Sequence, residues 1–399
     1  MDAQHCLHSV QEQLCAYLER VTLSSLPPNC EKLNAFMRCM KALSLEYLEW
    51  PSAQTQPIMP AVAHTSVLRS VWTTGTGKPL TIKLFFKYNS WEASSALPPL
   101  LVAEAEGLAV VNEHFSSESM RTPFVLLGGI VRHEGICVDF VLMEYTTLLR
   151  GGDEHIWASH LTAFHRTPVE PRKFSPRFLS ESSMLLTDTS DAVHPEESCR
   201  WGFFLNNSCG STLVRNPWTA HWGDFFTDSR LIPLFAQLAR RGHIFPNTKI
   251  VCDKSRYFLN AHESHIQPSL VHGDLWAGNM AFCQPVDWLA LEAALKSGFP
   301  PDQLPVESTQ PIFFDICPFI GDREVDHGMM ALHGCPRARM AGVMTQWEPP
   351  ARWTDRRCVY NLFHQLNHLL LFGNSYLPEV KAAMDFVASL INKTPESLY

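Results

Sequence analysis

The chain has 399 residues, of which 46% are hydrophobic and 18% charged, an ordinary globular composition with enough length for a large core. Its formal net charge of -8 leaves no basic surplus for neutralising phosphates, which disfavours a nucleic-acid binder. The twelve cysteines include no Cys-x-x-Cys pair, so zinc-ribbon and thioredoxin-type sites are unsupported. We expect reduced thiols, no secretory signal, no membrane span and a cytoplasmic location.

Two amphipathic helices are expected in the first fifty residues. Apolar side chains recur at helical spacing from Leu7 to Val21 and again from Leu33 to Leu43, on either side of a break at 24–29. We interpret residues 1–50 as a helical extension that packs on the body of the protein. Its sequence carries no residue pattern that assigns it a chemical role.

A hairpin and an alternating strand follow the extension. Residues 61–74 are predicted to form a strand and hairpin, and 80–88 places aliphatic side chains on one face and Lys83 and Lys87 on the other. The alternation alone does not choose between the two lysines. The segment 75–79, Gly-Thr-Gly-Lys-Pro, lacks the spacing of a Walker phosphate-binding loop and the Ser or Thr after its lysine, so a turn is predicted.

The next elements alternate between helix and strand. Residues 99–115 have a helical pattern that carries two acids, Glu104 and Glu106. A strand at 136–145 ends in Leu-Met-Glu-Tyr, and a helix is predicted at 157–166.

A long loop rich in Pro, Ser, Thr and Asp is predicted at 168–197. After it, large aromatic side chains fall at helical spacing, and we expect most of them in the core; they are Trp218, Trp222, Phe225 and Phe226.

The stretch 269–280, Ser-Leu-Val-His-Gly-Asp-Leu-Trp-Ala-Gly-Asn-Met, carries the most chemical information. It places Asp274 five residues before Asn279, as kinases space the acid that meets the substrate hydroxyl and the amide that holds magnesium. Downstream, Asp315 closes an apolar run at 311–314 and offers a second hard ligand. Each feature alone is also an ordinary turn or cap, but their combination predicts phosphoryl transfer.

Two further segments invite alternative interpretations. The insertion at about 283–310 has a helical half and a proline-rich return, which predicts a surface excursion without chemistry of its own. The helix expected at 357–371 carries His364 and His368 one turn apart. A zinc site there lacks the glutamate of His-Glu-x-x-His and a third ligand, so structural or substrate-contacting histidines are favoured.

Several strings resemble the fructosamine kinase (ketosamine-3-kinase) family, which belongs with aminoglycoside and choline kinases. The first is His-Gly-Asp-Leu-Trp-Ala-Gly-Asn at 272–279, and the second is Gly-Asp-Arg-Glu-Val-Asp at 321–326. Similar strings stand at 210–219, 366–368 and 372–373. The resemblance extends from about residue 80 to the end of the chain and does not explain the extension or the insertion.

This resemblance implies an α+β, two-lobed protein-kinase-like fold. We expect a small β-rich N-lobe at 51–147, after the extension at 1–50, and a larger, mainly helical C-lobe at 148–399 that includes the insertion. The family's phosphate-covering loop commonly contains glycine, whereas 62–67 has none.

The resemblance also implies site residues and the cofactors ATP and Mg²⁺. Lys87 would clamp the phosphates with Glu104 as its partner, and the hinge backbone would hold the adenine at Met143, Glu144 and Tyr145. Asp274 would be the base, with Asn279 and Asp315 as magnesium ligands. Contacts with the acceptor are expected from five further residues, which are His272, Trp276, Trp218, Asn367 and His368.

The implied reaction is phosphorylation of a ketosamine, on a protein or a small amine, at its third sugar hydroxyl. The product is unstable and releases the amine, which amounts to deglycation. One alternative is a kinase of this fold with another hydroxyl acceptor, such as an aminoglycoside or choline. A second is a non-catalytic nucleotide-binding protein, although a scaffold has no need of the two acids. No nucleic-acid or membrane partner is expected, and the oligomeric state stays open.

Overall fold

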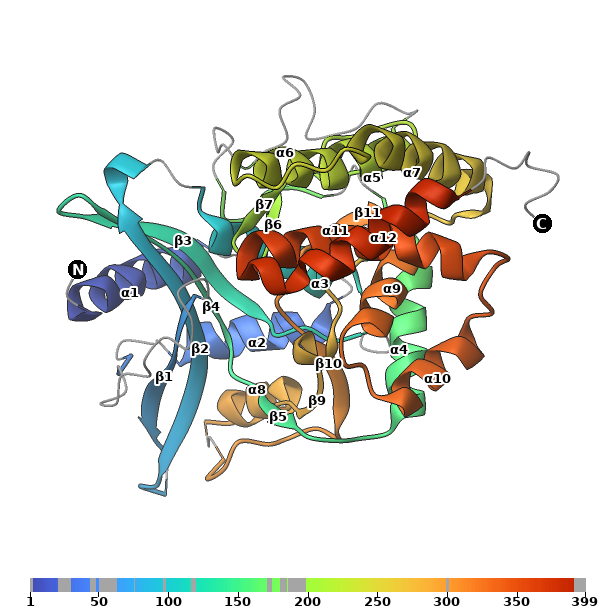
Figure 1. Cartoon of the computed structure of the whole chain (residues 1–399). Helices are drawn as coiled ribbons and strands as arrows, with labels where there is room; N and C mark the ends of the chain where they lie inside the picture. The colour runs from blue at the N-terminus through green and yellow to red at the C-terminus, as the bar shows by residue number, and fades with distance from the viewer. Residues whose placement is uncertain are drawn as a thin grey trace. The chain divides into compact units, whose positions relative to one another are not determined.

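The computed structural model describes residues 3–20, 30–43, 48–49, 63–74, 76–95, 98–115, 120–170, 174–179, 185, 199–298 and 301–390 (Figure 1). The chain divides into two compact units. Unit 1 comprises Met1–Asp153, Pro176–Ser180 and Ala281–Phe314, and unit 2 comprises Glu154–Ser175, Glu181–Met280 and Asp315–Tyr399. Among the described helices, none is both long and apolar enough to cross a membrane.

Unit 1 is built on a four-stranded antiparallel sheet of order β1-β2-β4-β3. Its strands are β1 (His64–Thr73), β2 (Pro79–Glu92), β3 (Val125–His133) and β4 (Ile136–Glu144). The expected hairpin joins β1 to β2, with residues 76–78 in its turn, which confirms the prediction of a turn there; 61, 62 and 75 lie outside the described residues. Helix α3 (Leu100–His114) packs on β3 and β4.

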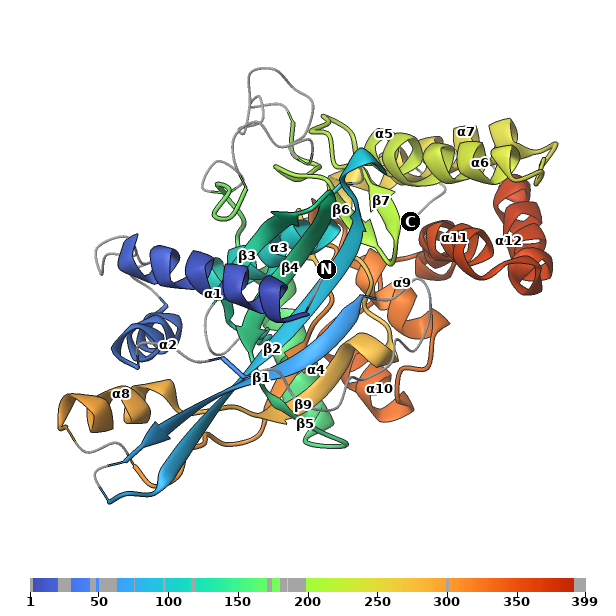
Figure 2. The same cartoon turned by 90° about the vertical axis from the view of Figure 1, so that its left-hand side faces the viewer.

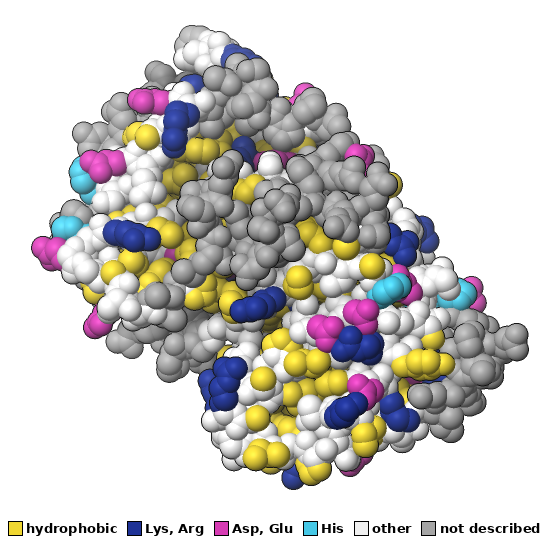
Figure 3. Space-filling model, turned by 90° about the horizontal axis from the view of Figure 1, so that it is seen from above, with side chains coloured by type: hydrophobic (Ala, Val, Ile, Leu, Met, Phe, Trp, Pro, Cys, Tyr) yellow, Lys and Arg dark blue, Asp and Glu magenta, His cyan; other side chains and the backbone are white. Residues whose placement is uncertain are grey.

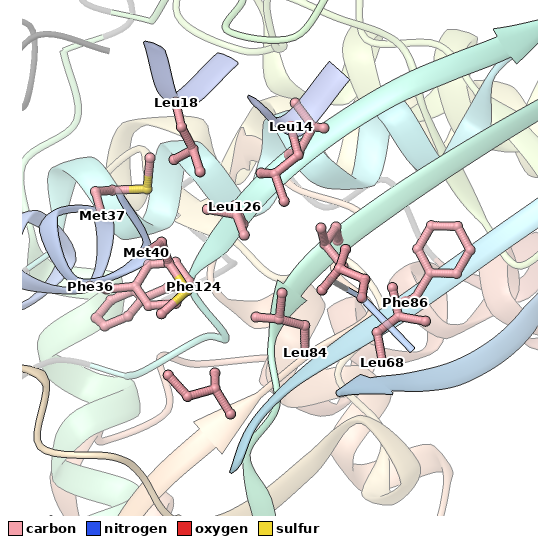
Figure 4. Close-up of a cluster of buried hydrophobic side chains, with 14 of the residues drawn as sticks. Leu14, Leu18, Phe36, Met37, Met40, Leu68, Leu84, Phe86, Phe124 and Leu126 are labelled. Carbon is pink, nitrogen blue, oxygen red and sulfur yellow. The ribbon is translucent and has the colours of Figure 1, made fainter. Parts of the chain in front are cut away.

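The aliphatic face of this sheet is covered by helices from two distant parts of the chain. They are α1 (Ala3–Arg20) and α2 (Glu31–Ala42) from the extension and α8 (Trp288–Lys296) from the insertion, and Figure 2 shows them following one another along one side of the sheet. In Figure 4, Leu14 and Leu18 of α1 and Phe36, Met37 and Met40 of α2 lie with sheet side chains in one buried cluster. Each such side chain contributes roughly 1.5–3 kcal/mol when fully buried.

This packing agrees with one expectation and changes another. The extension packs on the body of the protein as expected, and its apolar stripe completes the core of unit 1. The insertion was expected as a surface excursion of the C-lobe, whereas residues 281–314 belong to unit 1 and bury Trp288 and Leu291. The physical reason is that these two apolar side chains find a partner surface in α2, with Trp288 edge-on to Phe36 at 4.8 Å between ring centroids.

A second sheet follows the order β10-β9-β5, with β5 (Thr147–Leu149), β9 (Met280–Gln284) and β10 (Gln310–Phe313). Short 3-10 turns elsewhere are η2 (Ala93–Ser95), η5 (Glu263–His265), η6 (Ala277–Asn279) and η7 (Asn374–Tyr376). The expected loop at 168–197 lies largely outside the described residues.

Unit 2 is mainly helical. Its helices are α4 (Glu154–Arg166), α5 (Trp222–Phe226), the π-helical η4 (Thr227–Leu231), α6 (Ile232–Arg240), α7 (Thr248–His262), α9 (Glu324–Leu332), α10 (Arg337–Gln346), α11 (Trp353–Phe372) and α12 (Leu377–Ser389). Two strand pairs accompany them, β6 (Asn207–Cys209) with β7 (Thr212–Val214) and β8 (Ser269–Val271) with β11 (Phe319–Gly321). The aromatic side chains expected in the core, Trp222, Phe225 and Phe226, are buried against Tyr360 or Phe319.

The exposed charges are mixed in sign. On the face seen in Figure 3, Lys and Arg side chains alternate with Asp and Glu among apolar patches, and the described residues of that face form no continuous basic area. This agrees with a chain whose acids outnumber its bases. All twelve cysteines are free thiols in the structure.

Candidate functional site

Unit 1 brings together a lysine of its sheet and a glutamate of the helix that packs on the sheet. The alternation of β2 directs Lys87 away from the aliphatic face, and its Nζ donates to Oε2 of Glu104 on α3 at 2.8 Å. The two side chains are only 12% and 10% exposed, so their attraction is weakly screened. Lys83, the other lysine on this face, lies over the ring of Tyr145, 5.2 Å from its centroid. The structure therefore pairs Lys87, and not Lys83, with an acid.

Glu106, the other acid on α3, serves a different contact. Its carboxylate accepts the main-chain N–H groups of Arg177, Phe178 and Leu179 at 2.6–2.9 Å. Burial raises the pKa of Glu106, and the three N–H donors oppose that rise. Glu106 thus anchors the segment 177–179 to unit 1 and is not the partner of the lysine.

The expected hinge, at the end of β4, is held by its own glutamate. The carboxylate of Glu144 accepts two hydrogen bonds from Arg121 Nη2 at 2.8 Å, one from Trp288 Nε1 at 2.7 Å and one from the N–H of Phe124 at 3.2 Å. The N–H of Glu144 donates to the Phe124 carbonyl at 2.8 Å. Since Glu144 is buried and its side chain is engaged, a nucleotide contact here would come from other main-chain atoms of 143–145.

Unit 2 carries the loop that holds the candidate base. Gly273 has a φ of +82°, and a Cβ there would lie 2.1 Å from the Cys317 carbonyl oxygen, so this position requires glycine. The buried carboxylate of Asp326 accepts the N–H groups of His272 at 2.8 Å and Gly273 at 2.9 Å. It also pairs with Nε2 of His165 at 2.9 Å. Asp326 therefore holds the loop in shape from the first turn of α9.

Sequence reasoning missed three of these supporting residues. Asp326 stood in the quoted string 321–326 without a role, and Arg121 and Trp288 were not considered. An acid near the start of a helix is an ordinary sequence feature. Only the tertiary contacts with 272–273 and with Glu144 reveal what these side chains do.

Asp274 and Asn279 face each other across the loop. The Asn279 Nδ2 donates to the Asp274 carbonyl at 2.9 Å and to its carboxylate Oδ2 at 3.3 Å. These bonds orient the amide so that its oxygen points away from Asp274. The oxygen is thereby placed to act as a ligand for a hard cation.

Asp315 follows β10 and has a left-handed backbone, with a φ of +56°, which costs a non-glycine residue about 1–2 kcal/mol.

The pKa of Asp274 is raised to about 7, chiefly by burial and in addition by the neighbouring carboxylates of Asp315 and Asp326. A bound cation, for which Asp315 and Asn279 are the candidate ligands, would offset this repulsion. The donor set of carboxylate and amide oxygens fits Mg²⁺.

The five expected acceptor contacts differ in how accessible they are. Trp276 is 41% exposed, and its ring lies over Gly278, where a Cβ would come within 2.3 Å of it. Trp218 is buried. His272 is fully buried, and its Nδ1 accepts the N–H of Asp274 at 3.2 Å, so its observed contact shapes the loop.

The two C-terminal candidates have partners inside unit 2. Asn367 accepts from the Thr212 hydroxyl at 2.6 Å and donates to the Cys209 carbonyl at 3.2 Å, which ties α11 to the β6–β7 hairpin. His368 contacts His333 at 3.2 Å between ring nitrogens, and burial lowers its pKa to about 4, so it is neutral at pH 7.

This chain is similar to known proteins in its family pattern, its sequence and its structure. The fructosamine kinase family model matches residues 79–390. A relative from Synechocystis sp. named "Probable ketoamine kinase" is 34% identical over 180 residues, which is 45% of this chain and 52% of the relative. A second protein of that name, from Vibrio vulnificus, is 31% identical over 195 residues, or 48% and 58%. The chain thus spans about half the length of the curated relatives it matches.

Two solved structures share the architecture. One is named as a candidate fructosamine-3-kinase from Haemophilus somnus, with a TM-score of 0.56, 16% identity and coverage of 86% of this chain and 90% of that one. The other, with the same name and from Thermobifida fusca, has a TM-score of 0.54, 17% identity and coverage of 88% and 98%. These likenesses confirm the predicted kinase-like α+β fold, with a small antiparallel sheet in its N-terminal part and a helical C-terminal part.

Proposed function

This chain belongs to the fructosamine kinase family, and we propose that it transfers the γ-phosphoryl group of ATP to the third sugar hydroxyl of a ketosamine. The observation that carries the proposal is the cluster of Asp274, Asn279 and Asp315 in unit 2. These side chains provide a candidate base and the oxygen ligands that phosphoryl transfer to a hydroxyl uses.

Asp274 is the candidate base. The acceptor O–H would donate to its carboxylate, which orients the oxygen for in-line attack and takes the proton as the new bond forms. A pKa of about 7 suits this role, because a base works best when its pKa lies near the working pH. Asn279 and Asp326 keep the carboxylate and its loop in position.

Asn279 and Asp315 would hold the magnesium ion that ATP brings. When bound, such an ion would neutralise the charge that develops on the transferred phosphoryl group. Lys87 would hold the α- and β-phosphates, and Glu104 keeps its ammonium group in one orientation through the 2.8 Å ion pair. The hinge at Met143, Glu144 and Tyr145 would meet the adenine through main-chain atoms.

The acceptor assignment is supported by the names of the relatives, each of which is called a probable ketoamine kinase. Trp276, exposed beside the base, is the platform we propose for the sugar-amine. The other four expected residues would contribute indirectly, by shaping the acceptor site; they are Trp218, His272, Asn367 and His368. Phosphorylation at the third hydroxyl would make the adduct unstable and free the amine, which is deglycation of a protein or small amine, in the cytoplasm where ATP is supplied.

An acceptor panel tests this proposal. The full chain is incubated with magnesium ATP and with a ribulosamine, a fructosamine, an aminoglycoside or choline, and products are identified by phosphorus NMR and mass spectrometry. We expect phosphate on the third hydroxyl of one of the two ketosamines. Transfer only to choline or the aminoglycoside would overturn the acceptor, and ATP binding without transfer to any of them would overturn the kinase assignment.

A further inference from the structure

One cluster in unit 2 combines three kinds of metal ligand beside the candidate base. The Sγ of Cys209, a carboxylate oxygen of Asp274 and a ring nitrogen of His364 all lie within 4.8 Å of one another. They come from three separate segments, the end of β6, the loop after β8 and the middle of α11. The His364 Nδ1 lies 3.7 Å from Asp274 Oδ1, close to the spacing of two ligands around one tetrahedral ion.

His364 is the feature that points to a ligand. It is 1% exposed, and neither of its ring nitrogens has a hydrogen-bond partner among the described residues. Buried polar groups are nearly always hydrogen-bonded, because a buried polar group without a hydrogen bond costs free energy. Burial lowers the pKa of His364 well below its usual value, so the ring is neutral and keeps a lone pair for a metal ion.

Cys209 is held in place by the same helix. It is buried, and its carbonyl accepts from Asn367, which stands one turn after His364 on α11. The thiol and the imidazole therefore keep a fixed separation. Burial and the neighbouring Asp274 raise the pKa of the thiol, so a metal ion must release its proton on binding.

We propose that Cys209, Asp274 and His364 form a binding site for a thiophilic divalent cation, of which Zn²⁺ is the representative. Sulfur, nitrogen and oxygen ligands suit zinc, whereas Mg²⁺ prefers oxygen alone, so magnesium would not compete here. Binding exchanges the S–H bond for an S–metal bond and releases one proton to water. Since the ion occupies Asp274, it inhibits phosphoryl transfer, and this consequence rests on the proposed function.

Cobalt is the probe for the site itself. Co²⁺ added to the full chain should bind one ion per chain and show thiolate-to-cobalt charge-transfer absorption, which Zn²⁺ abolishes by displacement. Cys209→Ser should lose that absorption, and His364→Gln should weaken Co²⁺ binding at least about 10-fold. Cys252→Ser, at another buried thiol of unit 2 outside the cluster, is the matched control and should keep the wild-type spectrum. Absorption that survives Cys209→Ser, or that the wild type lacks, overturns the proposal.

Inhibition is measured separately, as the ratio of turnover with and without added Zn²⁺ at saturating magnesium ATP. The wild-type ratio should fall, and the ratio for Cys209→Ser should stay near one. An equal fall in both proteins would overturn the inhibitory role. If the protein phosphorylates no acceptor, only the proposed function is overturned, because the cobalt spectrum still decides whether the metal site exists.

Discussion

The loop at 272–279 in unit 2 and the helical layer of unit 1 are held by opposite means. Around 272–279, main-chain groups converge on single polar side chains, above all on Asp326, which accepts two N–H groups. The layer of α1, α2 and α8 is held by apolar packing between segments far apart in the chain, with Phe36 between Phe124 and Trp288.

Polar contacts also join the parts of that layer, but they lie near its surface. Arg38 donates to both carboxylate oxygens of Glu292 at 2.6 and 2.8 Å, and Lys32 pairs with Glu307 at 2.5 Å. Partly exposed pairs contribute little free energy. From this comparison, we expect a substitution in the loop to lower turnover with little change in stability. A substitution in the layer should lower stability with little change in turnover.

The largest effect is expected from Asp274→Asn. It should lower turnover at least ~100-fold, the scale of a positioned general base, with little change in the thermal midpoint because the side chain is 18% exposed and keeps its size. Steady-state kinetics and thermal unfolding check this. Asp253→Asn, at an exposed acid on α7, is the control and should leave both unchanged. Unchanged turnover in Asp274→Asn would remove this residue from its assigned role.

The converse result is expected from Phe36→Ala. Deleting this fully buried ring should lower the unfolding free energy of unit 1 by about 3–5 kcal/mol, while turnover per folded molecule stays near wild type. Denaturant unfolding and kinetics at low temperature measure the two quantities. The control is Val71→Ala on exposed β1, for which about 0.5 kcal/mol or less is expected. A large loss of turnover in folded Phe36→Ala would break the contrast.

Trp288→Phe tests a direct contact between the layer and the expected hinge. The change keeps the ring in the cluster and removes the Nε1 bond to Glu144, which should cost about 1.5–3 kcal/mol of stability because the acceptor is charged. If that bond also positions the hinge, KM for ATP should rise several-fold while kcat stays constant. Leu291→Met on the same helix is the packing control. Equal kinetics in the two variants would show that Trp288 contributes to stability and not to the position of the hinge.

The smallest effect is expected from Glu292→Gln, and it should depend on pH. Hydrogen bonds from Arg38 lower the pKa of Glu292 from 4.5 to about 2, so the charged form is stabilised in the folded state. The contribution, about 1 kcal/mol at most, is fully present above pH 4.5 and is lost as pH falls toward 2. Denaturation at neutral and acid pH should show the variant and wild type converging on acidification. A difference that grows in acid would contradict the sign.

The same contrast explains how far sequence reasoning reached. Several elements, such as α1, α2 and α3, were predictable from the periods of their apolar residues, whereas β3, α6 and α7 were not predicted. Lys87 and Glu104 meet as expected. Glu106 and Lys83 were alternatives until the structure showed their other contacts, with 177–179 and with Tyr145. Two lysines or two glutamates of one element are told apart only by the residues that they contact. A local sequence pattern does not contain those contacts.

By itself, the sequence determined that Asp274 and Asn279 come together, because they stand five residues apart across one turn that Gly273 permits. The tertiary structure alone decided which core receives the extension and the insertion, and which buried histidine comes to lie beside Asp274. The reason is physical. A short turn is set by neighbouring residues, whereas apolar burial is non-directional and accepts any surface of matching shape, however distant in the chain.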